Sequence, residues 1–408
     1  MKILIVSSSD ISGGAAKAAY RLHCALLEHG INSQMVVMRK ETDNVTVFGP
    51  SSNFGKISAL FSPVLEKLIT DLPYRSKKSM FSAGWIPSRK IIDRINSMNP
   101  DLVHLHWING GMIKIEDLKK INAPILWNLQ DMWPFTGGCH FNDQCDRYQD
   151  KCGSCRVLSS NYKYDISSLT HTRKYRNYNK INKLVINGVS QWIASCAKKS
   201  SLFKGREVVN LPNTINSDLF RPIDKELARE SFNVPQEKKV VLFGASSVTD
   251  PRKGYTELLA ALSVLDYSNL ILVVAGQSKP VEPIVAKFPV YYIPPVHDDV
   301  SLSLMYNVAN VVVVPSIQEN LSNTVIESMA CGVPVVAFNI GGNSDMIDHK
   351  KNGYLAQLQD ENDLAHGISW SLDNEHPLLS KNAREKVIQT FSHSAVVKRY
   401  VELYREIL

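Results

Sequence analysis

Short apolar runs alternate with helix-like segments along most of this chain, and the alternation limits the folds open to it. The chain begins with an apolar run over residues 2–7, continues through a polar loop over 8–14, and then shows a helical pattern from about 15 to 29 that stops at Gly30. Strands buried on both faces of a parallel sheet have such continuous apolar sequences, and helices connect them. We therefore predict an α/β protein with parallel sheets flanked by helices.

The apolar runs fall into two series, which predicts two domains. The first series continues at 34–38, 101–106 and 125–129, and the second has strands at 240–243, 270–275, 311–314 and 334–338 with helices over 255–265, 302–307 and 323–330. Turn-forming residues are concentrated between the two series, at 210–222. With 408 residues, we expect an N-terminal domain over 1–210, a C-terminal domain over 211–385, and a helix over 386–408 that is a candidate for packing back on the N-terminal domain.

An insertion at about 50–90 interrupts the alternation. Within it, residues 57–69 place apolar side chains near helical spacing. We favour the interpretation that this apolar face packs on the domain. The alternative is contact with an acceptor or a membrane, to which Lys77, Lys78 and Trp85 would contribute.

The composition is globular, with 44% hydrophobic and 21% charged residues. No run of about 18 uncharged apolar residues occurs, so we expect no membrane-spanning helix. The apolar start is too short for a signal peptide, and we expect a cytoplasmic protein. Contact with the inner face of the cell membrane is compatible with that location.

The net charge of +7 is unevenly distributed, because residues 147–183 combine many cations and five tyrosines with few acids. Such a surface suits an anionic membrane or a pyrophosphate-bearing lipid, and it would also suit RNA. Simple solubility is the third interpretation. The basic residues are Arg147, Lys151, Arg156, Lys163, Arg173, Lys174, Arg176, Lys180 and Lys183.

The segment 319–334 carries the strongest chemical signal. It follows the apolar run at 311–314. Ser322 or Asn323 would cap a short helix, and Gly332 would end it before a proline. The segment therefore predicts a strand, a loop and a helix in succession, and the crevice beyond the strand is where parallel sheets bind ligands.

Two glutamates lie in that segment, Glu319 in the loop and Glu327 on the helix. Carboxylates there can accept hydrogen bonds from sugar hydroxyls, and backbone N–H groups at the helix start suit phosphate or sugar oxygens. Besides the glutamates, the residues expected to bind a donor molecule are Asn320, Leu321, Ser322, Asn323 and Thr324.

The two glutamates, seven residues apart and followed by Met-Ala-Cys-Gly-Val-Pro-Val-Val-Ala, resemble the signature of the family 4 retaining glycosyltransferases. Segments at 13–14, 101–106, 211–214 and 341–342 are similar to the family as well, so the resemblance extends over nearly the whole chain. It implies the GT-B fold, in which two Rossmann-like domains face each other across a cleft. It also implies a nucleotide-sugar donor held mainly by the C-terminal domain, and catalysis without a metal or other cofactor.

Carried over from the family, Glu319 is a catalytic residue that contacts the transferred sugar, and Glu327 contacts the ribose hydroxyls. Arg252 and Lys253 precede a predicted helix, where cations would stabilise the diphosphate as it leaves. In the family an arginine usually follows the glycine that ends the preceding strand, but Ala245 stands there in this chain. The catalytic role of Lys253 is therefore better supported than that of Arg252.

In the N-terminal domain, Gly13 and Gly14 follow the first strand, where backbone can approach a ligand. The resemblance makes this a loop for the donor phosphates or the acceptor. Gln130 and Asp131 stand where many relatives have a His-Asp pair, and Gln130 can donate a hydrogen bond but cannot carry a proton. The acceptor-side candidates are His106, Gln130, Asp131 and His140, and His104 is a further candidate.

Four cysteines are closely spaced, at Cys139, Cys145, Cys152 and Cys155. The last two have the spacing of a metal-binding knuckle, and disulfides are rare in cytosolic proteins. A structural zinc site is one interpretation, and free thiols or a regulatory disulfide are the others. His140 could replace one ligand.

These observations predict a retaining hexosyltransferase that moves a sugar from a nucleotide-sugar to an acceptor hydroxyl. The expected acceptor is a lipid-linked saccharide in bacterial surface-polysaccharide assembly, such as capsule, exopolysaccharide or lipopolysaccharide, and no nucleic-acid partner is expected. A nucleotide-sugar epimerase or a sugar phosphorylase on the same fold is the alternative among enzymes. A zinc-stabilised RNA-binding protein is the alternative from another class.

Overall fold

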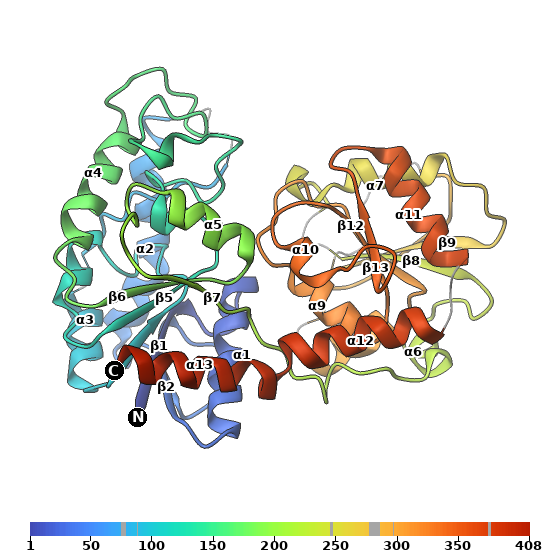
Figure 1. Cartoon of the computed structure of the whole chain (residues 1–408), viewed down its shortest axis with the longest axis horizontal. Coiled ribbons are helices and arrows are strands. Elements are labelled where there is room, and N and C mark those ends of the chain that lie inside the picture. Colours follow the sequence, from blue (N-terminus) through green and yellow to red (C-terminus); the bar gives the residue numbers. More distant parts are fainter. Residues whose placement is uncertain (75–78, 88, 245–247, 277–285, 297, 374–376) are drawn as a thin grey trace. The chain divides into compact units, whose positions relative to one another are not determined.

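The computed structural model describes all residues except 75–78, 88, 245–247, 277–285, 297 and 374–376. These residues form two compact units (Figure 1). Met1–Thr214 and Val396–Leu408 make the N-terminal unit, and Ile215–Ala395 makes the C-terminal unit. The division falls within the turn-rich segment at 210–222. Ala245, Lys77 and Lys78 lie outside the described residues.

The N-terminal unit is built on a seven-stranded parallel sheet with the order β3-β2-β1-β4-β5-β6-β7. Its strands are β1 (Lys2–Ser9), β2 (Asn32–Arg39), β3 (Val47–Phe48), β4 (Leu102–Leu105), β5 (Ile125–Leu129), β6 (Leu184–Gly188) and β7 (Val208–Asn210). Its helices are α1 (Gly14–Glu28), α2 (Asn53–Asp71), α3 (Arg89–Ser97), α4 (Ile166–Tyr178) and α5 (Gln191–Lys199), with short 3-10 turns at Ile115–Lys120, Trp133–Phe135 and Arg147–Gln149.

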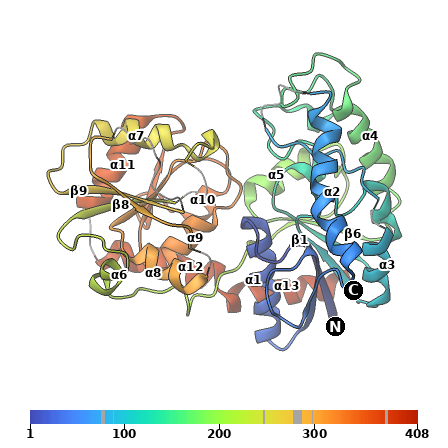
Figure 2. The same cartoon turned by 180° about the vertical axis from the view of Figure 1, so that it is seen from behind.

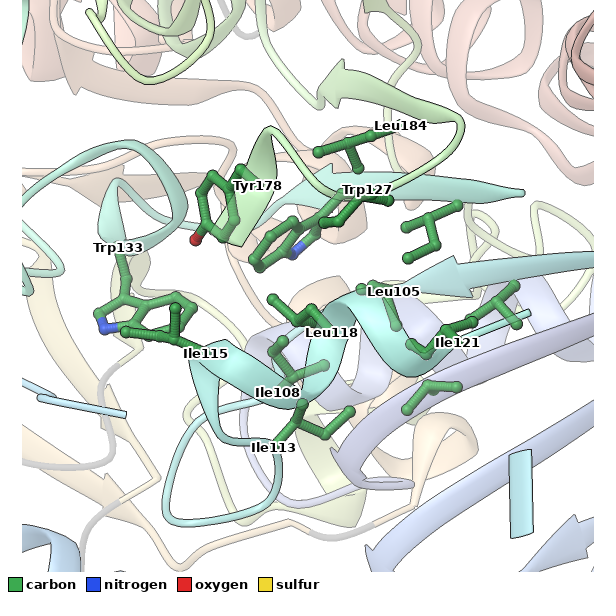
Figure 3. Packing of buried hydrophobic residues seen from close by; sticks show 14 of the residues in the cluster. Leu105, Ile108, Ile113, Ile115, Leu118, Ile121, Trp127, Trp133, Tyr178 and Leu184 are labelled. Atoms are coloured by element: carbon green, nitrogen blue, oxygen red, sulfur yellow. The ribbon is translucent and has the colours of Figure 1, made fainter. Parts of the chain in front are cut away.

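Both faces of this sheet are covered, which explains the uninterrupted apolar run in β1. Leu4 and Val6 point into the cluster shared with α3, β5 and α5, part of which Figure 3 shows. Ile3 and Ile5 point to the opposite face, into a second cluster shared with α1. Because successive side chains of a strand alternate between faces, the run from Ile3 to Val6 is buried on both sides of the sheet and is apolar throughout.

The C-terminal unit repeats the plan with a six-stranded parallel sheet in the order β10-β9-β8-β11-β12-β13. Its strands are β8 (Lys239–Gly244), β9 (Leu270–Ala275), β10 (Val290–Ile293), β11 (Val311–Val314), β12 (Val335–Phe338) and β13 (Gly353–Ala356). Its helices are α6 (Lys225–Ser231), α7 (Tyr255–Ser263), α8 (Asp299–Asn307), α9 (Asn323–Ala330), α10 (Asn343–Met346), α11 (Glu361–Asp373) and α12 (Pro377–Phe391), and a 3-10 turn spans Pro251–Lys253. The prediction of parallel sheets flanked by helices is confirmed in both units.

The last helix, α13 (His393–Ile407), carries the chain back into the N-terminal unit. Tyr400 and Tyr404 are completely buried there, in the cluster that contains Ile3 and Ile5. The hydroxyl of Tyr400 accepts a hydrogen bond from Asn128 Nδ2 at 2.9 Å. Figures 1 and 2 show α13 and α1 on the same side of this sheet.

Helix α2 forms in the insertion as predicted, but the favoured interpretation of its apolar face is wrong. Leu60, Phe61 and Leu65 are 50–61% exposed. The residues that the unit buries are instead Ser62 and Glu66, whose carboxylate accepts hydrogen bonds from the backbone N–H groups of residues 84 and 85. The pattern predicted the helix correctly and its inward face incorrectly. Within the described ranges, no helix has both the length and the apolar character needed to cross a bilayer.

The basic segment 147–183 is not a uniform cationic surface. Lys174 is fully buried and donates to the carbonyls of residues 133 and 136. Arg173 makes paired hydrogen bonds to the Glu116 carboxylate at 2.7 Å. Arg147 and Lys183 donate to backbone carbonyls. Four of the nine cations are thus engaged within the unit, which weakens the case for an RNA-binding surface.

Candidate functional site

The strand order brings two predicted loops of the C-terminal unit together. β8 and β11 are neighbours at the centre of the sheet, and the order reverses between them. The loops that follow such a pair of strands enclose a crevice at the carboxyl edge, the usual ligand site of this sheet type. Lys253 follows β8 and Glu319 follows β11, so the topology places both at this crevice.

Lys253 and Glu319 form an ion pair, with 3.1 Å between Lys253 Nζ and Glu319 Oε2. Their side chains are 37% and 16% exposed. The other carboxylate oxygen of Glu319 accepts the backbone N–H of Asn320 at 3.1 Å. A cation that remains accessible beside an oriented carboxylate can bind both the phosphate and the hydroxyl groups of a ligand.

Arg252 pairs with the carboxylate that lies two residues before it. Its guanidinium binds the carboxylate of Asp250 with two hydrogen bonds, at 2.7 and 3.1 Å. Asp250 also caps the following turn by accepting the backbone N–H of Arg252. These bonds hold the pKa of Asp250 below its usual value. The structure brings Lys253, and not the guanidinium of Arg252, to Glu319.

Two glycines allow the loops to approach each other closely. Gly254 has φ of 71°, and a Cβ atom on it would lie 1.8 Å from the carbonyl oxygen of Pro315. Gly341 has φ of 52°, and a Cβ atom on it would lie 1.9 Å from the carbonyl oxygen of Glu319. A residue with a side chain at either position would push the Lys253 or Glu319 backbone out of place.

Helix α9 starts beside the same loops. A Cβ atom on Gly244, the last residue of β8, would lie 3.9 Å from Thr324 Cγ2. Ser322 precedes the helix in an extended conformation, and its hydroxyl does not cap the first turn. The early N–H groups of a helix attract anions. The predicted donor residues 320–324 therefore surround one helix start next to Lys253.

Glu327 lies on α9 and is only 5% exposed. Its Oε2 atom accepts a hydrogen bond from the hydroxyl of Tyr306, on α8, at 2.7 Å. Tyr306 could not be predicted from the sequence, because the contact between Tyr306 and Glu327 depends on how α8 packs against α9. The hydroxyl fixes one carboxylate oxygen, which orients the carboxylate in a buried setting.

In the N-terminal unit, β1 and β4 are the neighbours at which the strand order reverses. Gly13 follows β1 with φ of 92° and open space around its Cα. Asp10 anchors this loop, because its carboxylate accepts the backbone N–H groups of Ile11, Glu41 and Thr42 at 2.9–3.1 Å. Gly14 begins α1, so this helix also starts at the carboxyl edge of its sheet.

Asp131 and His140, both predicted for the acceptor side, form a buried pair. His140 Nδ1 lies 2.6 Å from Asp131 Oδ2, which also accepts Trp107 Nε1 at 2.8 Å. Burial acts to raise the pKa of Asp131. The electrostatic attraction of His140 and these hydrogen bonds have a larger effect in the opposite direction, so the pKa is lowered overall. An ionised Asp131 requires His140 to donate from Nδ1.

Ser82 completes a chain with this pair, since its hydroxyl lies 2.9 Å from His140 Nε2. Whichever of the two atoms donates in this bond, the Ser82 oxygen retains a lone pair for another hydroxyl. Ser82 lines a pocket of about 460 Å³ together with Pro63, Phe81 and Trp107. Sequence analysis missed Ser82, which lies 58 residues from His140 in the chain.

The other acceptor-side candidates are packed into the unit. Gln130 forms reciprocal amide hydrogen bonds with Asn213, at 3.0 and 3.2 Å. His106 is buried beside Gln130, and burial together with the neighbouring His104 holds its pKa well below the ordinary value. His104 donates to or accepts from the Tyr404 hydroxyl at 2.8 Å and links the sheet to α13.

The four clustered cysteines line one small cavity and have free thiols. Burial raises the pKa of Cys139, Cys152 and Cys155 above the usual range. Across the part of the chain that the structure describes, no three His, Cys, Asp or Glu side chains are grouped to hold a metal ion. The zinc site stays a prediction.

Comparisons with known proteins agree with this architecture. Sucrose-phosphate synthase from Thermosynechococcus elongatus superimposes with a TM-score of 0.67 at 20% identity, over 100% of this chain and 99% of that one. Anabaena Alr3699/HepE, solved in complex with UDP and glucose, gives a TM-score of 0.64 at 16% identity, over 99% of both chains. At such identities the likeness establishes the fold, and the fold is GT-B.

Residues 224–390 match the family model described as Glycosyl transferases group 1. D-inositol 3-phosphate glycosyltransferase 2 from Catenulispora acidiphila is 31% identical over 211 residues, which cover 47% of this chain and 48% of that protein. The chain thus spans about half the length of the curated relatives it matches. The matched family segment contains Lys253, Glu319 and Glu327.

Proposed function

We propose that this protein is a retaining hexosyltransferase that transfers a sugar from a nucleotide-sugar to an acceptor hydroxyl. The ion pair of Lys253 and Glu319, at the carboxyl edge of the C-terminal sheet, is the observation that carries the proposal. It supplies a cation for a diphosphate and a carboxylate for a sugar, next to the start of α9. The match of residues 224–390 to the family model of Glycosyl transferases group 1 supports the same activity.

In this proposal the diphosphate lies against Lys253 and the first N–H groups of α9. As the glycosidic bond breaks, negative charge builds on the diphosphate, and a fixed cation stabilises that charge more than it stabilises the bound donor. Glu319 holds hydroxyls of the transferred sugar, and Glu327, oriented by Tyr306, holds hydroxyls of the ribose. The chemistry needs no side-chain nucleophile and no bound metal.

We further propose a lipid-linked saccharide of bacterial surface-polysaccharide assembly as the acceptor. The pocket beside Ser82 supports this choice, because apolar Pro63, Phe81 and Trp107 line it together with polar residues such as Ser82, whose hydroxyl lies beside His140. Such a lining suits an amphipathic molecule better than a small, fully polar one. Transfer from labelled donor into the butanol-soluble lipids of a bacterial membrane extract supports this acceptor, and transfer only to a water-soluble acceptor such as an inositol phosphate contradicts it.

The donor is tested by thermal unfolding with UDP-, GDP-, ADP- and CMP-sugars and their free nucleotides. UDP-glucose is the first choice, because Alr3699/HepE has been solved with UDP and glucose. A ligand at 100 times its Kd adds about 2.7 kcal/mol to the stability of the chain. Glu327→Gln keeps the shape of the side chain but weakens the ribose contacts, whereas exposed Glu237→Gln is the matched control.

We expect one nucleotide family to stabilise the wild type and the Glu237 variant, and to stabilise the Glu327 variant less. The absence of stabilisation by every nucleotide-sugar contradicts the proposed function. Stabilisation that Glu327→Gln leaves unchanged places the donor elsewhere. Donor turnover without any acceptor, yielding an isomerised nucleotide-sugar, identifies an epimerase instead.

A further inference from the structure

One face of α2 carries large apolar side chains that the N-terminal unit leaves uncovered. Their positions repeat at intervals of three and four residues, so they share one side of the helix. Figure 2 shows α2 at the front of that view of the unit. The residues are Ile57, Leu60, Phe61, Val64, Leu65, Leu68 and, just after the helix, Leu72, each 44–69% exposed.

The opposite face of α2, which the unit buries, is small or polar. Ala59, Ser62, Glu66 and Thr70 are at most 8% exposed. Glu66 is satisfied there, because its carboxylate accepts the backbone N–H of Gly84 at 2.6 Å. A helix that only had to pack on its own domain would have the reverse arrangement. The outward apolar face therefore points to a partner outside the unit.

Two further exposed apolar side chains lie near α2. Trp85, 36% exposed, follows Gly84, and its backbone N–H lies 3.4 Å from Glu66 Oε2, so it is adjacent to α2. The Arg173 guanidinium lies 5.4 Å from the centre of the Trp85 ring. Met80 is 50% exposed. Exposed tryptophan is favourable where hydrocarbon meets headgroups, and the Arg173 guanidinium, which pairs with Glu116, holds the Trp85 ring in place.

The charges around the face are chiefly positive. Lys56 and Lys67 are exposed on α2. Of the two acids on this helix, Glu66 is buried, and Asp71 is partly shielded at 3.9 Å from Lys67. A long apolar stripe flanked by lysines matches a helix that lies in the interface of an anionic bilayer.

We propose that this face of α2 docks on an anionic lipid bilayer, with the helix in the plane of the interface and its apolar side chains among the upper acyl chains. The protein would then meet a membrane-held acceptor while its pocket beside Ser82 stays close to the lipid. The biological setting rests on the proposed function, but the docking itself requires neither donor nor turnover.

The test is partitioning of the full chain onto vesicles of phosphatidylcholine mixed with phosphatidylglycerol, measured by co-sedimentation. The double variant Phe61→Ser/Leu65→Ser removes two central side chains of the face. The matched control, Leu169→Ser/Leu227→Ser, removes leucines that are 50% and 54% exposed on α4 and α6. We expect the partition coefficient to fall about tenfold for each α2 side chain and to stay unchanged in the control.

A charge variant separates the two contributions. Lys56→Gln/Lys67→Gln lowers partitioning about fivefold for each lysine on vesicles that contain phosphatidylglycerol, and has little effect on phosphatidylcholine alone. Added salt should reduce the wild-type affinity toward that of the charge variant.

Three results overturn the proposal. The first is a wild type that does not sediment with either vesicle, and the second is unchanged binding by Phe61→Ser/Leu65→Ser. The third is self-association in solution that this variant abolishes, which makes a second copy of the chain the partner of α2. Nucleotide-sugar stabilisation, measured on the same preparations, reports the site in the other unit, so failure of docking and failure of the proposed activity are distinguished.

Discussion

Replacing Lys253 with alanine should separate catalysis from stability in the C-terminal unit. The side chain is 37% exposed and its only described ion pair is with Glu319, at 3.1 Å. Partly exposed pairs of this kind contribute up to about 1 kcal/mol to the free energy of unfolding. The variant should therefore unfold within about 4 °C of the wild type.

The effect of Lys253→Ala on turnover should be much larger. A fixed group that stabilises charge developing on the leaving diphosphate contributes about 2.7–4 kcal/mol, which corresponds to a loss of about 10²–10³ in kcat. Release of nucleotide diphosphate from the donor that stabilises the protein is the assay, with and without acceptor. Lys253→Arg keeps the charge and should recover part of the lost rate.

Glu319→Gln is the companion measurement, because it breaks the same ion pair from the other side. If the pair were only structural, both variants would lose the same small amount of stability and little activity. A Lys253→Ala variant with kcat within about threefold of the wild type refutes the assignment of this lysine. A drop in activity that merely follows a drop in unfolding free energy also refutes it.

Other perturbations test the supporting structure. Tyr306→Phe removes the hydrogen bond to buried Glu327 and should lower the free energy of unfolding by about 1–3 kcal/mol in urea titrations; no change indicates that Glu327 finds another partner. Gly254→Ala should lower the free energy of unfolding by more than about 2 kcal/mol, because φ is 71° and the added Cβ would collide with the Pro315 carbonyl. An unchanged melting temperature would show that the loop adapts. Burial lowers the pKa of His104 to about 4, below its unfolded value of about 6.5. The neutral imidazole therefore contributes about 3 kcal/mol to the free energy of unfolding above a pH of about 6.5, and this contribution is lost as the pH falls through 4. His104→Gln should make the free energy of unfolding less dependent on acid pH. Metal analysis of the purified protein decides the cysteine cluster, with one zinc per chain supporting the predicted site and none, with reactive thiols after unfolding, contradicting it.

The sheets and the donor loops could be predicted because their causes are local or topological. The valines of β11 are buried on both faces, so the strand is apolar throughout. Lys253 and Glu319 follow strands that are neighbours in the sheet, and parallel strands end at one edge. Their approach to 3.1 Å follows from that order once the fold class is known.

The features that escaped prediction depend on contacts distant in the chain. The inward face of α2 is decided by Glu66, which binds backbone 18 residues further on. Helical periodicity reports that a face is apolar, but not whether a protein or a membrane covers it. The pairing of Arg252 with Asp250 was not predicted, and the donor-binding role of Arg252 stays a prediction. Tyr306 and Ser82 meet their partners only through tertiary packing.

The return of α13 to the first sheet has a consequence for how the protein is made. Residues 396–408 supply Tyr400, Tyr404 and Ile407 to a core that contains Ile3 and Ile5 from the start of the chain. A ribosome must therefore synthesise the whole C-terminal unit before the N-terminal one can close its second face. Until then, α1 and the adjoining sheet expose apolar surface to which chaperones can bind and which makes the chain susceptible to proteases. A chain interrupted before α13 leaves the second face of the N-terminal sheet open even when the C-terminal unit is complete, so truncated products should be degraded rather than accumulate.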